Sequence, residues 1–256
     1  MEGKEGWGDR SRSPQTPRRY FGSEPTEAPS LSNGGGSGGS ASLPPAFVSL
    51  LSAIRTAKRE ETPFRHWHLH DLLLPEILSA LANFSPAPAC PVDTQGRRET
   101  NNATRAFLNP AIQAAHPACA AIAQAFQSET VVRALSDLCT VDLTGSFLRI
   151  EYCQDMGGFW LEPHTDIGAK RFTLLNYLVD PPPGECWGTD LLHPDGSLAV
   201  RAAGAANTGV LFIPGSDTWH GFAPRPITGL RRTLIVNYVV PEWRAVHELS
   251  FPAASI

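Results

Sequence analysis

Three residues have the types and the spacing of ligands for one metal ion. His164 and Asp166 lie two positions apart in the segment PHTDIG, and such residues point the same way on an extended chain. His220 comes much later, after the apolar run TGVLFIP and a short polar turn. Strands far apart in sequence meet in a β-sandwich, so this second histidine can join the first pair. Two imidazoles and one carboxylate occupy one face of an octahedron and leave three positions open.

A buried arginine predicts a binding group for an anion. Arg231 begins the predicted strand RRTLIVNYVV, and Thr233 lies on the same face of that strand. An arginine inside a β-sandwich is costly unless it meets an anion, and a carboxylate offers a bidentate partner. We therefore predict that Arg231 binds a carboxylate, with Thr233 as a second donor. Arg232 competes for this role, because a register shifted by one residue turns it inward instead.

Other histidines and a simple loop are the competing interpretations. The segment HWHLH (66–70) has three histidines, but no second cluster of matching ligands follows it, so a metal site there is disfavoured. His116 stands alone further on. A solvated loop would explain His164 and Asp166 by themselves. The predicted strand that begins with Arg231, after His220, favours the metal site over such a loop.

The elements that must position these residues change character near residue 145. Segments within 43–144, such as LPEILSALANF and HPACAAIAQAFQ, carry apolar residues at three- and four-residue spacing and predict helices. In 145–240, short β-branched and aromatic runs alternate with Gly, Pro, Asp and Asn, as in an antiparallel sandwich or barrel. We therefore expect a single α+β domain over 43–256, with a helical half packed on a double-sheet half.

The pattern HTD…H…RxT, set in short strands after a helical segment, resembles the 2-oxoglutarate- and Fe(II)-dependent oxygenases, most of all the branch of the prolyl hydroxylases. The resemblance covers residues 145–240. It implies a double-stranded β-helix (jelly roll) with the N-terminal helices packed on one sheet. It also implies that Fe(II) is held by His164, Asp166 and His220. The distal carboxylate of 2-oxoglutarate would pair with Arg231, assisted by Thr233.

Two tyrosines also match positions of this family. Tyr152, in RIEYCQDMGG, resembles a tyrosine that lines the cofactor pocket. Tyr177, in FTLLNYL, resembles one that hydrogen-bonds the carboxylate of 2-oxoglutarate. Packing in the core is the alternative for both. Asn237 and Trp219 lie near the predicted pocket as well, for contact with substrate or for packing.

The implied activity is that of a 2-oxoglutarate-dependent dioxygenase, an oxidoreductase that uses O2, that ascorbate can stimulate and that hydroxylates an unactivated C–H bond. Halogenating relatives lack the carboxylate ligand, so Asp166 disfavours halogenation. Two alternatives stay open. One is a jelly-roll protein that binds a ligand without turnover; the other is a cupin-like metal dioxygenase that does not use 2-oxoglutarate, which leaves Arg231 unexplained. The substrate, a small molecule or a peptide, is not identified by the sequence.

Composition argues against several other classes of protein. The 256 residues are 42% apolar with a formal charge of −4, which suits one globular core and gives no reason for a nucleic-acid partner. No apolar run reaches the roughly 20 residues of a membrane span, and the first residues lack the apolar core of a secretory signal. The five cysteines form no CxxC motif, which predicts free thiols and a cytoplasmic location.

Two segments lie outside the predicted elements. Residues 1–42 are rich in Gly, Ser and Pro, and we expect them to be a disordered tail that is dispensable for folding. The polar stretch RRETNNATRAFLN (97–109) is predicted as a surface loop. The alternative is a lid over a polar or anionic substrate, formed with Arg97, Arg98, Asn101 and Arg105.

Overall fold

The computed structural model describes residues 45–86, 96–97 and 104–256, so the predicted tail lies outside the described residues. The helices are α1 (Pro45–Arg55), α2 (Pro75–Ala82), α3 (Pro110–Ala115), α4 (Pro117–Gln127), α5 (Glu129–Cys139) and the short 3-10 helix η2 (Val246–Glu248). The strands are β1 (Lys58–Glu60), β2 (His66–His70), β3 (Arg105–Phe107), β4 (Phe147–Asp155), β5 (Leu161–His164), β6 (Lys170–Tyr177), β7 (Asp190–Leu192), β8 (Leu198–Arg201), β9 (Thr208–Phe212), β10 (His220–Phe222) and β11 (Arg231–Val239).

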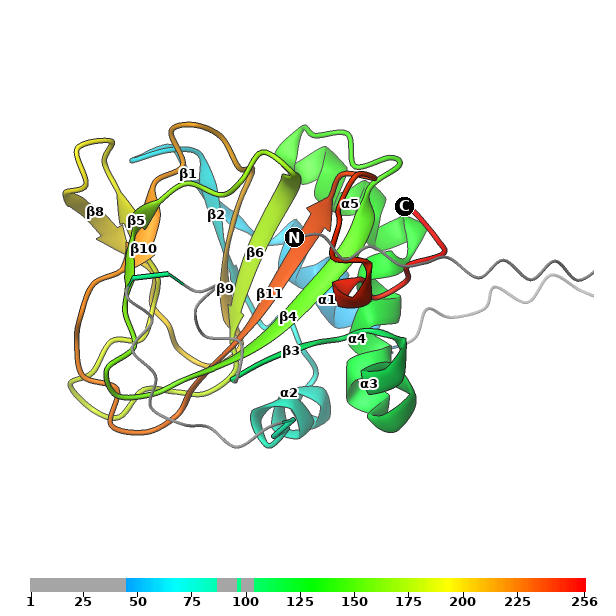
Figure 1. Cartoon of the computed structure of the whole chain (residues 1–256), viewed down its shortest axis with the longest axis horizontal. Coiled ribbons are helices and arrows are strands. Elements are labelled where there is room, and N and C mark those ends of the chain that lie inside the picture. The colour runs from blue at the N-terminus through cyan, green and yellow to red at the C-terminus, as the bar shows by residue number, and fades with distance from the viewer. Residues whose placement is uncertain (1–44, 87–95, 98–103) are drawn as a thin grey trace, which may run out of the picture. The chain divides into compact units, whose positions relative to one another are not determined.

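Within the described residues, the strands form two antiparallel sheets (Figure 1). The larger sheet has seven strands in the order β1-β2-β9-β6-β11-β4-β3. The smaller sheet has four strands in the order β5-β10-β7-β8. The long crossovers between sequence neighbours, together with the helices on one side, are those of a jelly roll. The predicted α+β jelly-roll fold is confirmed.

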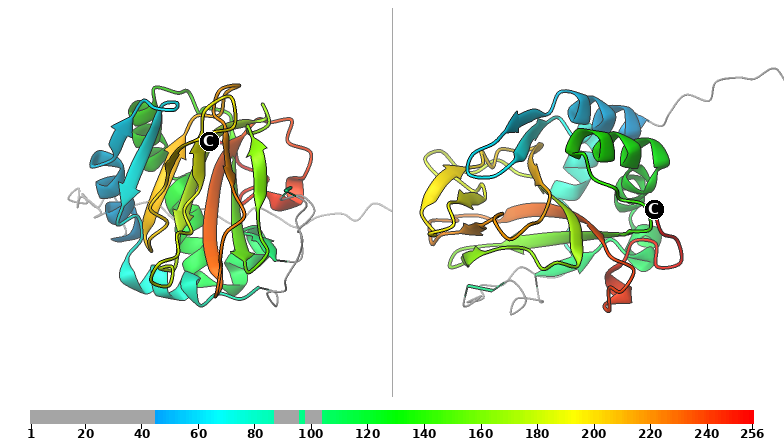
Figure 2. Two further views of the ribbon diagram at one scale, coloured as in Figure 1. Left: turned by 90° about the vertical axis from the view of Figure 1, so that its left-hand side faces the viewer. Right: turned by 90° about the horizontal axis from the view of Figure 1, so that it is seen from above.

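One face of the larger sheet is covered by helices (Figure 2). Helices α1, α2, α4 and α5 pack there against apolar side chains of β4, β6 and β11 in one continuous core. In α5 the buried residues recur on one side of the helix, and the Ser128 side chain caps its start by accepting from the Val131 N–H. The helical support predicted for 43–144 therefore rests on an apolar stripe that matches the sheet.

The region 43–144 is not only helical, because β1, β2 and β3 extend the larger sheet at its two edges. The prediction of a surface loop over 97–109 is wrong for β3, which pairs with β4. The Arg105 side chain on this strand forms a largely buried ion pair with Glu151. A polar stretch without apolar periodicity becomes a strand here because a neighbouring strand and a buried counter-charge hold it.

The other face of the larger sheet turns toward the smaller sheet. A second apolar cluster lies there, with Leu175, Val210, Phe212 and Ile235 among its members.

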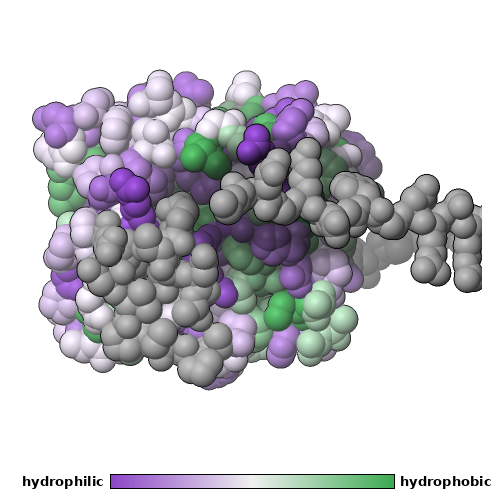
Figure 3. Space-filling model, viewed as in Figure 1, coloured by the Kyte–Doolittle hydropathy of each residue, from purple (hydrophilic) through white to green (hydrophobic). Residues whose placement is uncertain are grey.

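On the surface drawn in Figure 3, hydrophobic residues are interspersed with hydrophilic ones and gather in small groups. The described residues from 45 onward belong to one compact unit.

Two further observations bear on the class of protein. Among the described helices, none combines the length and the apolar character needed to span a bilayer. The described cysteines are free thiols, as predicted: Cys119, Cys139, Cys153 and Cys186. Burial raises the pKa of the Cys119 thiol to about 11 and that of Cys139 to about 12, so both are protonated and inert. Cys90 lies outside the described residues.

Candidate active site

The smaller sheet brings the two predicted histidine ligands face to face. His164 ends β5 and His220 begins β10, and the two residues are direct partners in the antiparallel pairing of these strands. Their ring centroids lie 4.3 Å apart. Asp166 follows two residues beyond β5, and the ligand atoms of all three residues lie within 4.8 Å of one another. In the described part of the chain, this is the one group of three such residues placed to share a metal ion.

Hydrogen bonds fix which nitrogen of each histidine is free. Nδ1 of His164 lies 2.8 Å from the carbonyl oxygen of Glu162, and Nδ1 of His220 lies 3.0 Å from that of Thr218. A carbonyl only accepts, so Nδ1 carries the proton in both rings and Nε2 keeps its lone pair for a metal. Burial lowers the pKa of His220 to about 4, against the opposing charge of Asp166, so this ring is neutral near pH 7.

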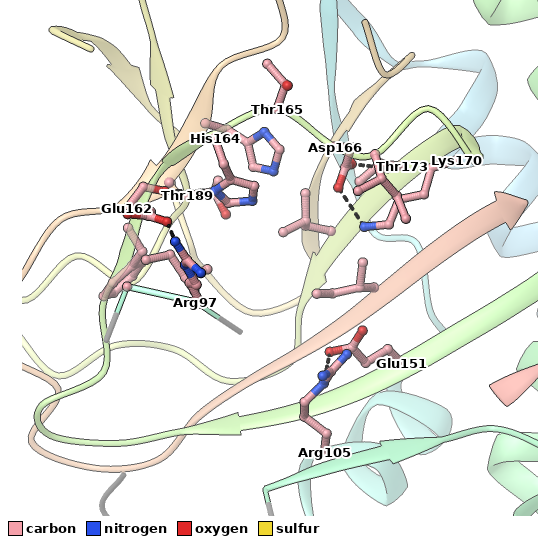
Figure 4. A pocket seen from close by; sticks show the side chains of 18 of the residues that line it. Arg97, Arg105, Glu151, Glu162, His164, Thr165, Asp166, Lys170, Thr173 and Thr189 are labelled. Atoms are coloured by element: carbon pink, nitrogen blue, oxygen red, sulfur yellow. Dashed lines mark hydrogen bonds and ion pairs between the residues drawn. The ribbon is translucent and has the colours of Figure 1, made fainter. Parts of the chain in front are cut away.

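Asp166 is held through both carboxylate oxygens, as Figure 4 shows. Lys170 Nζ lies 2.6 Å from Oδ1, and the Thr173 hydroxyl lies 2.7 Å from Oδ2. Burial favours the protonated acid, but it is outweighed by the charge of Lys170, by that of His220 once this ring is protonated at low pH, and by these hydrogen bonds, which lower the pKa of Asp166 to about 2. Two unprotonated imidazole nitrogens and one ionised carboxylate fit the ligand set of a non-haem Fe(II) centre.

These three residues lie in the wall of a cavity of about 570 Å³ between the two sheets. Part of the wall is apolar: Phe159, Leu161, Leu175, Phe222 and Ile235. The remaining wall carries charged and polar side chains at two ends. His164 and Asp166 lie at one end, and the ion pair of Arg105 with Glu151 lies at the other (Figure 4). The cavity therefore has room for a small molecule beside a metal ion.

Arg231 lines this cavity, while Arg232 faces the opposite side of the larger sheet. The Nε of Arg231 donates to the carbonyl oxygen of Trp187 at 2.7 Å, and Nη1 donates to the buried carboxylate of Asp155. The ring of Phe222 lies 4.8 Å from its guanidinium carbon. The predicted cation is thus present, but it already has one anionic partner in the protein.

Thr233 lies on the same strand face as Arg231 and is fully buried. It is not part of the cavity wall. Its Oγ1 has no hydrogen-bond partner among the described residues, which is a cost for a buried hydroxyl. The strand register therefore places the Arg-x-Thr pair as predicted and leaves one polar atom of the pair unsatisfied.

The two tyrosines have different surroundings. Tyr152 points into the helix-facing core, where its hydroxyl donates to the carbonyl oxygens of Leu81 and Phe84 at 2.9 and 2.7 Å. The prediction that Tyr152 lines the cofactor pocket is wrong, because alternation along β4 turns it to the face opposite the cavity. Tyr177 lies on the side of the second cluster, and its hydroxyl is bonded to Thr189, a residue of the cavity wall. Tyr177 itself stands behind that wall.

At the charged end of the cavity, only Arg105 had been a candidate on the basis of the sequence. Arg149 contacts Glu151 at 3.0 Å and Glu248 at 2.6 Å, and its guanidinium lies 5.2 Å from the Trp243 ring. The signal available for Arg149 and Glu151 was their spacing of two in the strand FLRIEYCQD, which puts two charges on one buried face. Nothing in the sequence marked Trp243 or Glu248, since both follow the last predicted strand.

The remaining candidates are placed as follows. Arg97 lines the cavity and pairs with Glu162 at 3.2 Å, whereas Arg98 and Asn101 lie outside the described residues. Trp219 is not in the cavity wall. Asn237 is buried on β11, between β4 and β6, directly beside residues of that wall.

The histidines of HWHLH lie on β2, away from the metal ligands. Nδ1 of His66 lies 2.8 Å from the carbonyl oxygen of Phe64, and its Nε2 lies 3.2 Å from Nε2 of His68. These two rings therefore satisfy each other. No third ligand among the described residues joins them.

Comparison with known proteins supports the fold. No protein-family model matches the sequence, and no curated protein matches it. A prolyl-4-hydroxylase of Pseudomonas putida superposes with a TM-score of 0.50 at 13% identity, over 76% of this chain and 98% of that one. A Trichoplax adhaerens prolyl hydroxylase, solved with a peptide of the hypoxia inducible factor oxygen degradation domain, gives 0.51 at 14% identity, over 78% and 91%. A Phytophthora capsici prolyl 4-hydroxylase gives 0.52 at 15% identity, over 78% and 66%.

At these identities the similarity establishes the fold alone. The chain has the jelly-roll fold of the prolyl-hydroxylase-like 2-oxoglutarate oxygenases, and the resemblance inferred from HTD…H…RxT is confirmed at that level.

Proposed function

We propose that this chain is an Fe(II)- and 2-oxoglutarate-dependent dioxygenase that hydroxylates an unactivated C–H bond. The observation that carries the proposal is the group of His164, Asp166 and His220, with ligand atoms within 4.8 Å of one another in the wall of a cavity. A structural zinc site would have four protein ligands, whereas these three leave positions open. The fold similarity supports the same class of enzyme.

Each residue of the site has a role in this proposal. His164 and His220 would bind Fe(II) through Nε2, and Asp166 would bind it through its carboxylate. Arg231 would pair with the distal carboxylate of 2-oxoglutarate, and its bond to Asp155 keeps the guanidinium in one orientation. When bound, Fe(II) and 2-oxoglutarate supply the oxygen-activating chemistry that hydroxylates a C–H bond.

Thr233, Tyr177 and the apolar wall would support this arrangement. The Thr233 hydroxyl, which has no partner among the described residues, would be the second donor to the distal carboxylate of 2-oxoglutarate. Tyr177 would act indirectly, because its hydroxyl holds Thr189 in the wall. The rings of Phe159 and Phe222 would exclude water from the region between Arg231 and the metal ligands.

The substrate we propose is a peptide or a small polar molecule. The Trichoplax enzyme was solved with a peptide, and the charged end of the cavity offers several donors and acceptors. We also propose stimulation by ascorbate, no nucleic-acid or membrane partner and, on the basis of the free thiols, a reducing compartment such as the cytoplasm.

One observation favours a second candidate. The charge of Arg231 is already paired with Asp155 inside the protein, so an incoming carboxylate is not needed to satisfy it. A metal-dependent oxygenase of this fold that does not use 2-oxoglutarate would show the same ion pair. It would bind the metal without any increase in affinity for 2-oxoglutarate.

The test is anaerobic binding of Mn(II) and 2-oxoglutarate, followed by succinate formation with Fe(II), O2 and ascorbate. We expect the unaltered chain to bind both and to release succinate. Asp166→Ala should abolish succinate formation and weaken metal binding by more than tenfold, whereas Asp137→Ala, at an exposed position of α5, should change neither. Metal binding and turnover that survive Asp166→Ala would refute the site. Metal binding without 2-oxoglutarate binding would favour the second candidate.

A further inference from the structure

A hydrogen-bond chain runs across three neighbouring strands from Asp166 to a buried arginine. The Thr173 hydroxyl, on β6, lies 2.7 Å from Asp166 Oδ2. Asn237, on β11, lies with its Nδ2 2.9 Å from the same hydroxyl oxygen and with its Oδ1 3.1 Å from Nη1 of Arg149, on β4. Asn237 is the direct pairing partner of both Thr173 and Arg149, so the three side chains form one row on the cavity-facing side of the sheet.

The direction of every bond in this row follows from the chemistry of its ends. A guanidinium only donates, so Arg149 donates to the amide oxygen of Asn237. The Asn237 NH2 group therefore points the other way and donates to Thr173. An ionised carboxylate only accepts, so the single hydroxyl proton of Thr173 goes to Asp166. All donors in the row point toward the carboxylate.

Both ends and the middle of the row are fixed in place. Arg149, Asn237 and Thr173 are all buried. Arg149 is held by Glu151 and Glu248, and Asn237 also donates to the carbonyl oxygen of Phe172 at 3.2 Å. The orientation of the Thr173 hydroxyl is thus determined by the sheet and not by solvent.

Asp166 needs such support because the backbone gives it little. It follows the end of β5 and belongs to no strand, unlike the two histidines. Its other partner, Lys170, is a flexible side chain that is partly exposed. A carboxylate that swings freely would lose conformational entropy on binding a metal, and a rigid hydrogen-bond donor removes most of that cost.

We propose that Thr173 is a positioning residue for Asp166, and that Asn237 and Arg149 act by fixing the direction of its hydroxyl. The inference rests on the proposed metal site and concerns residues that were not assigned a role there. Its consequence is that metal affinity depends on a buried row of side chains that never touches the ion.

The experiment measures the Kd for Co(II) without 2-oxoglutarate, together with the visible absorption of the bound ion. Thr173→Val keeps the shape of the side chain and removes the hydroxyl, so we expect binding about tenfold weaker and an altered Co(II) spectrum. Thr173→Ser keeps the hydroxyl and should stay within about threefold of the unaltered chain. The matched control is Thr208→Val, on β9, whose hydroxyl bonds the Ala205 carbonyl and no other group among the described residues.

Asn237→Asp provides an independent arm, since it replaces the donor to Thr173 by an acceptor of the same shape. The Thr173 proton then has two carboxylates to choose from, so metal binding should weaken as in Thr173→Val. Because both changes interrupt one row, the double variant should bind Co(II) no more than about twofold more weakly than Thr173→Val alone. Should Thr173→Val fail to fold, the comparison of Asn237→Asp with Thr173→Ser carries the same test.

Several outcomes would overturn the inference. These are unchanged Co(II) affinity in Thr173→Val or in Asn237→Asp, equal weakening in Thr173→Ser and Thr173→Val, or fully additive losses in the double variant. Failure of the unaltered chain to bind Co(II) would refute the proposed metal site itself. An equal loss in Thr208→Val would identify a general effect of strand damage and would also count against the inference.

Discussion

Strand β4 presents two buried faces whose chemistry is opposite. Leu148, Ile150 and Tyr152 point to the helices and belong to the main apolar core. Arg149 and Glu151, which alternate with them, point to the cavity and form ion pairs with each other and with neighbouring strands or helices. Residues on both faces are almost inaccessible to solvent, so burial alone does not distinguish them.

The helix-facing side of β4 stabilises the domain, whereas the cavity-facing side serves its function. On the helix-facing side, removal of apolar area from water favours folding directly. On the cavity-facing side, each buried charge carries a desolvation cost that its partners only offset, and apolar replacements of whole ion clusters are often no less stable. A sheet that needed only stability would have no use for this second face, and its charges therefore point to function.

The largest effect should come from breaking the charged face at its centre. Arg149→Met removes the shared partner of Glu151 and Glu248 and should lower the free energy of unfolding by about 3–5 kcal/mol in urea titrations. The same substitution at Arg133, in an exposed ion pair with Glu129 on α5, should leave it almost unchanged. Equal losses in the two variants would show that the buried cluster is no more important than a surface pair.

A smaller effect should distinguish the two neighbouring arginines of β11. Arg231→Ala should raise the Kd for 2-oxoglutarate by roughly ten- to a hundredfold, because a charged hydrogen bond contributes about 1.5–3 kcal/mol. The Kd for Mn(II) should stay the same, since the metal ligands are untouched. Arg232→Ala should alter neither constant, because that side chain faces the helices. The reverse pattern, with the loss in Arg232→Ala alone, would place the strand register one residue out.

Since Arg231→Ala also leaves Asp155 without this partner, the variant needs its own stability measurement. Arg231→Met combined with Asp155→Leu removes both charges and is the matched control for that loss. A decrease in cosubstrate affinity in both variants would assign the effect to the guanidinium.

The smallest effect should come from the hydroxyl of Tyr152. Tyr152→Phe removes its bonds to two carbonyl oxygens and should lower the free energy of unfolding by about 1 kcal/mol. The Kd for 2-oxoglutarate should not change, because the ring lies on the helix-facing side. Anaerobic titration of the cosubstrate provides the check. A clear loss of affinity for 2-oxoglutarate would show that Tyr152 contributes to the cosubstrate pocket, and it would contradict the distinction between the two faces.

Features tied to short spacings could be predicted from the sequence. The helices of 43–144 and the strands of 145–240 followed from their periodicity. His164 and Asp166 stand two residues apart, and this spacing identified them as a pair, although only His164 lies on a strand. Arg231 and Thr233 share a face for the same reason, whatever the neighbouring strands do.

Features that depend on which strands pair could not be predicted. The edge strand β3 forms because β4 and Glu151 are there to receive it. Tyr152 was misplaced because the side of the sheet on which it falls depends on the register between β4 and β11. The contributions of Trp243 and Glu248 come from the chain after the last strand, where no periodic pattern existed to extend.

The pairing of β5 with β10 has a consequence for how such a site can vary between proteins. His164 and His220 are joined by a backbone ladder, and the ladder is tight: a Cβ on Gly221 would lie 3.0 Å from the Leu161 carbonyl oxygen and 3.1 Å from that of Glu162. The intervening chain supplies β6 and β9 to the larger sheet and β7 and β8 to the smaller one, and β7 pairs with the other side of β10. Insertions and deletions in the turns between these strands would therefore leave both imidazoles in place. A search for relatives should match the two short sequence motifs around the ligands and allow any number of residues between them.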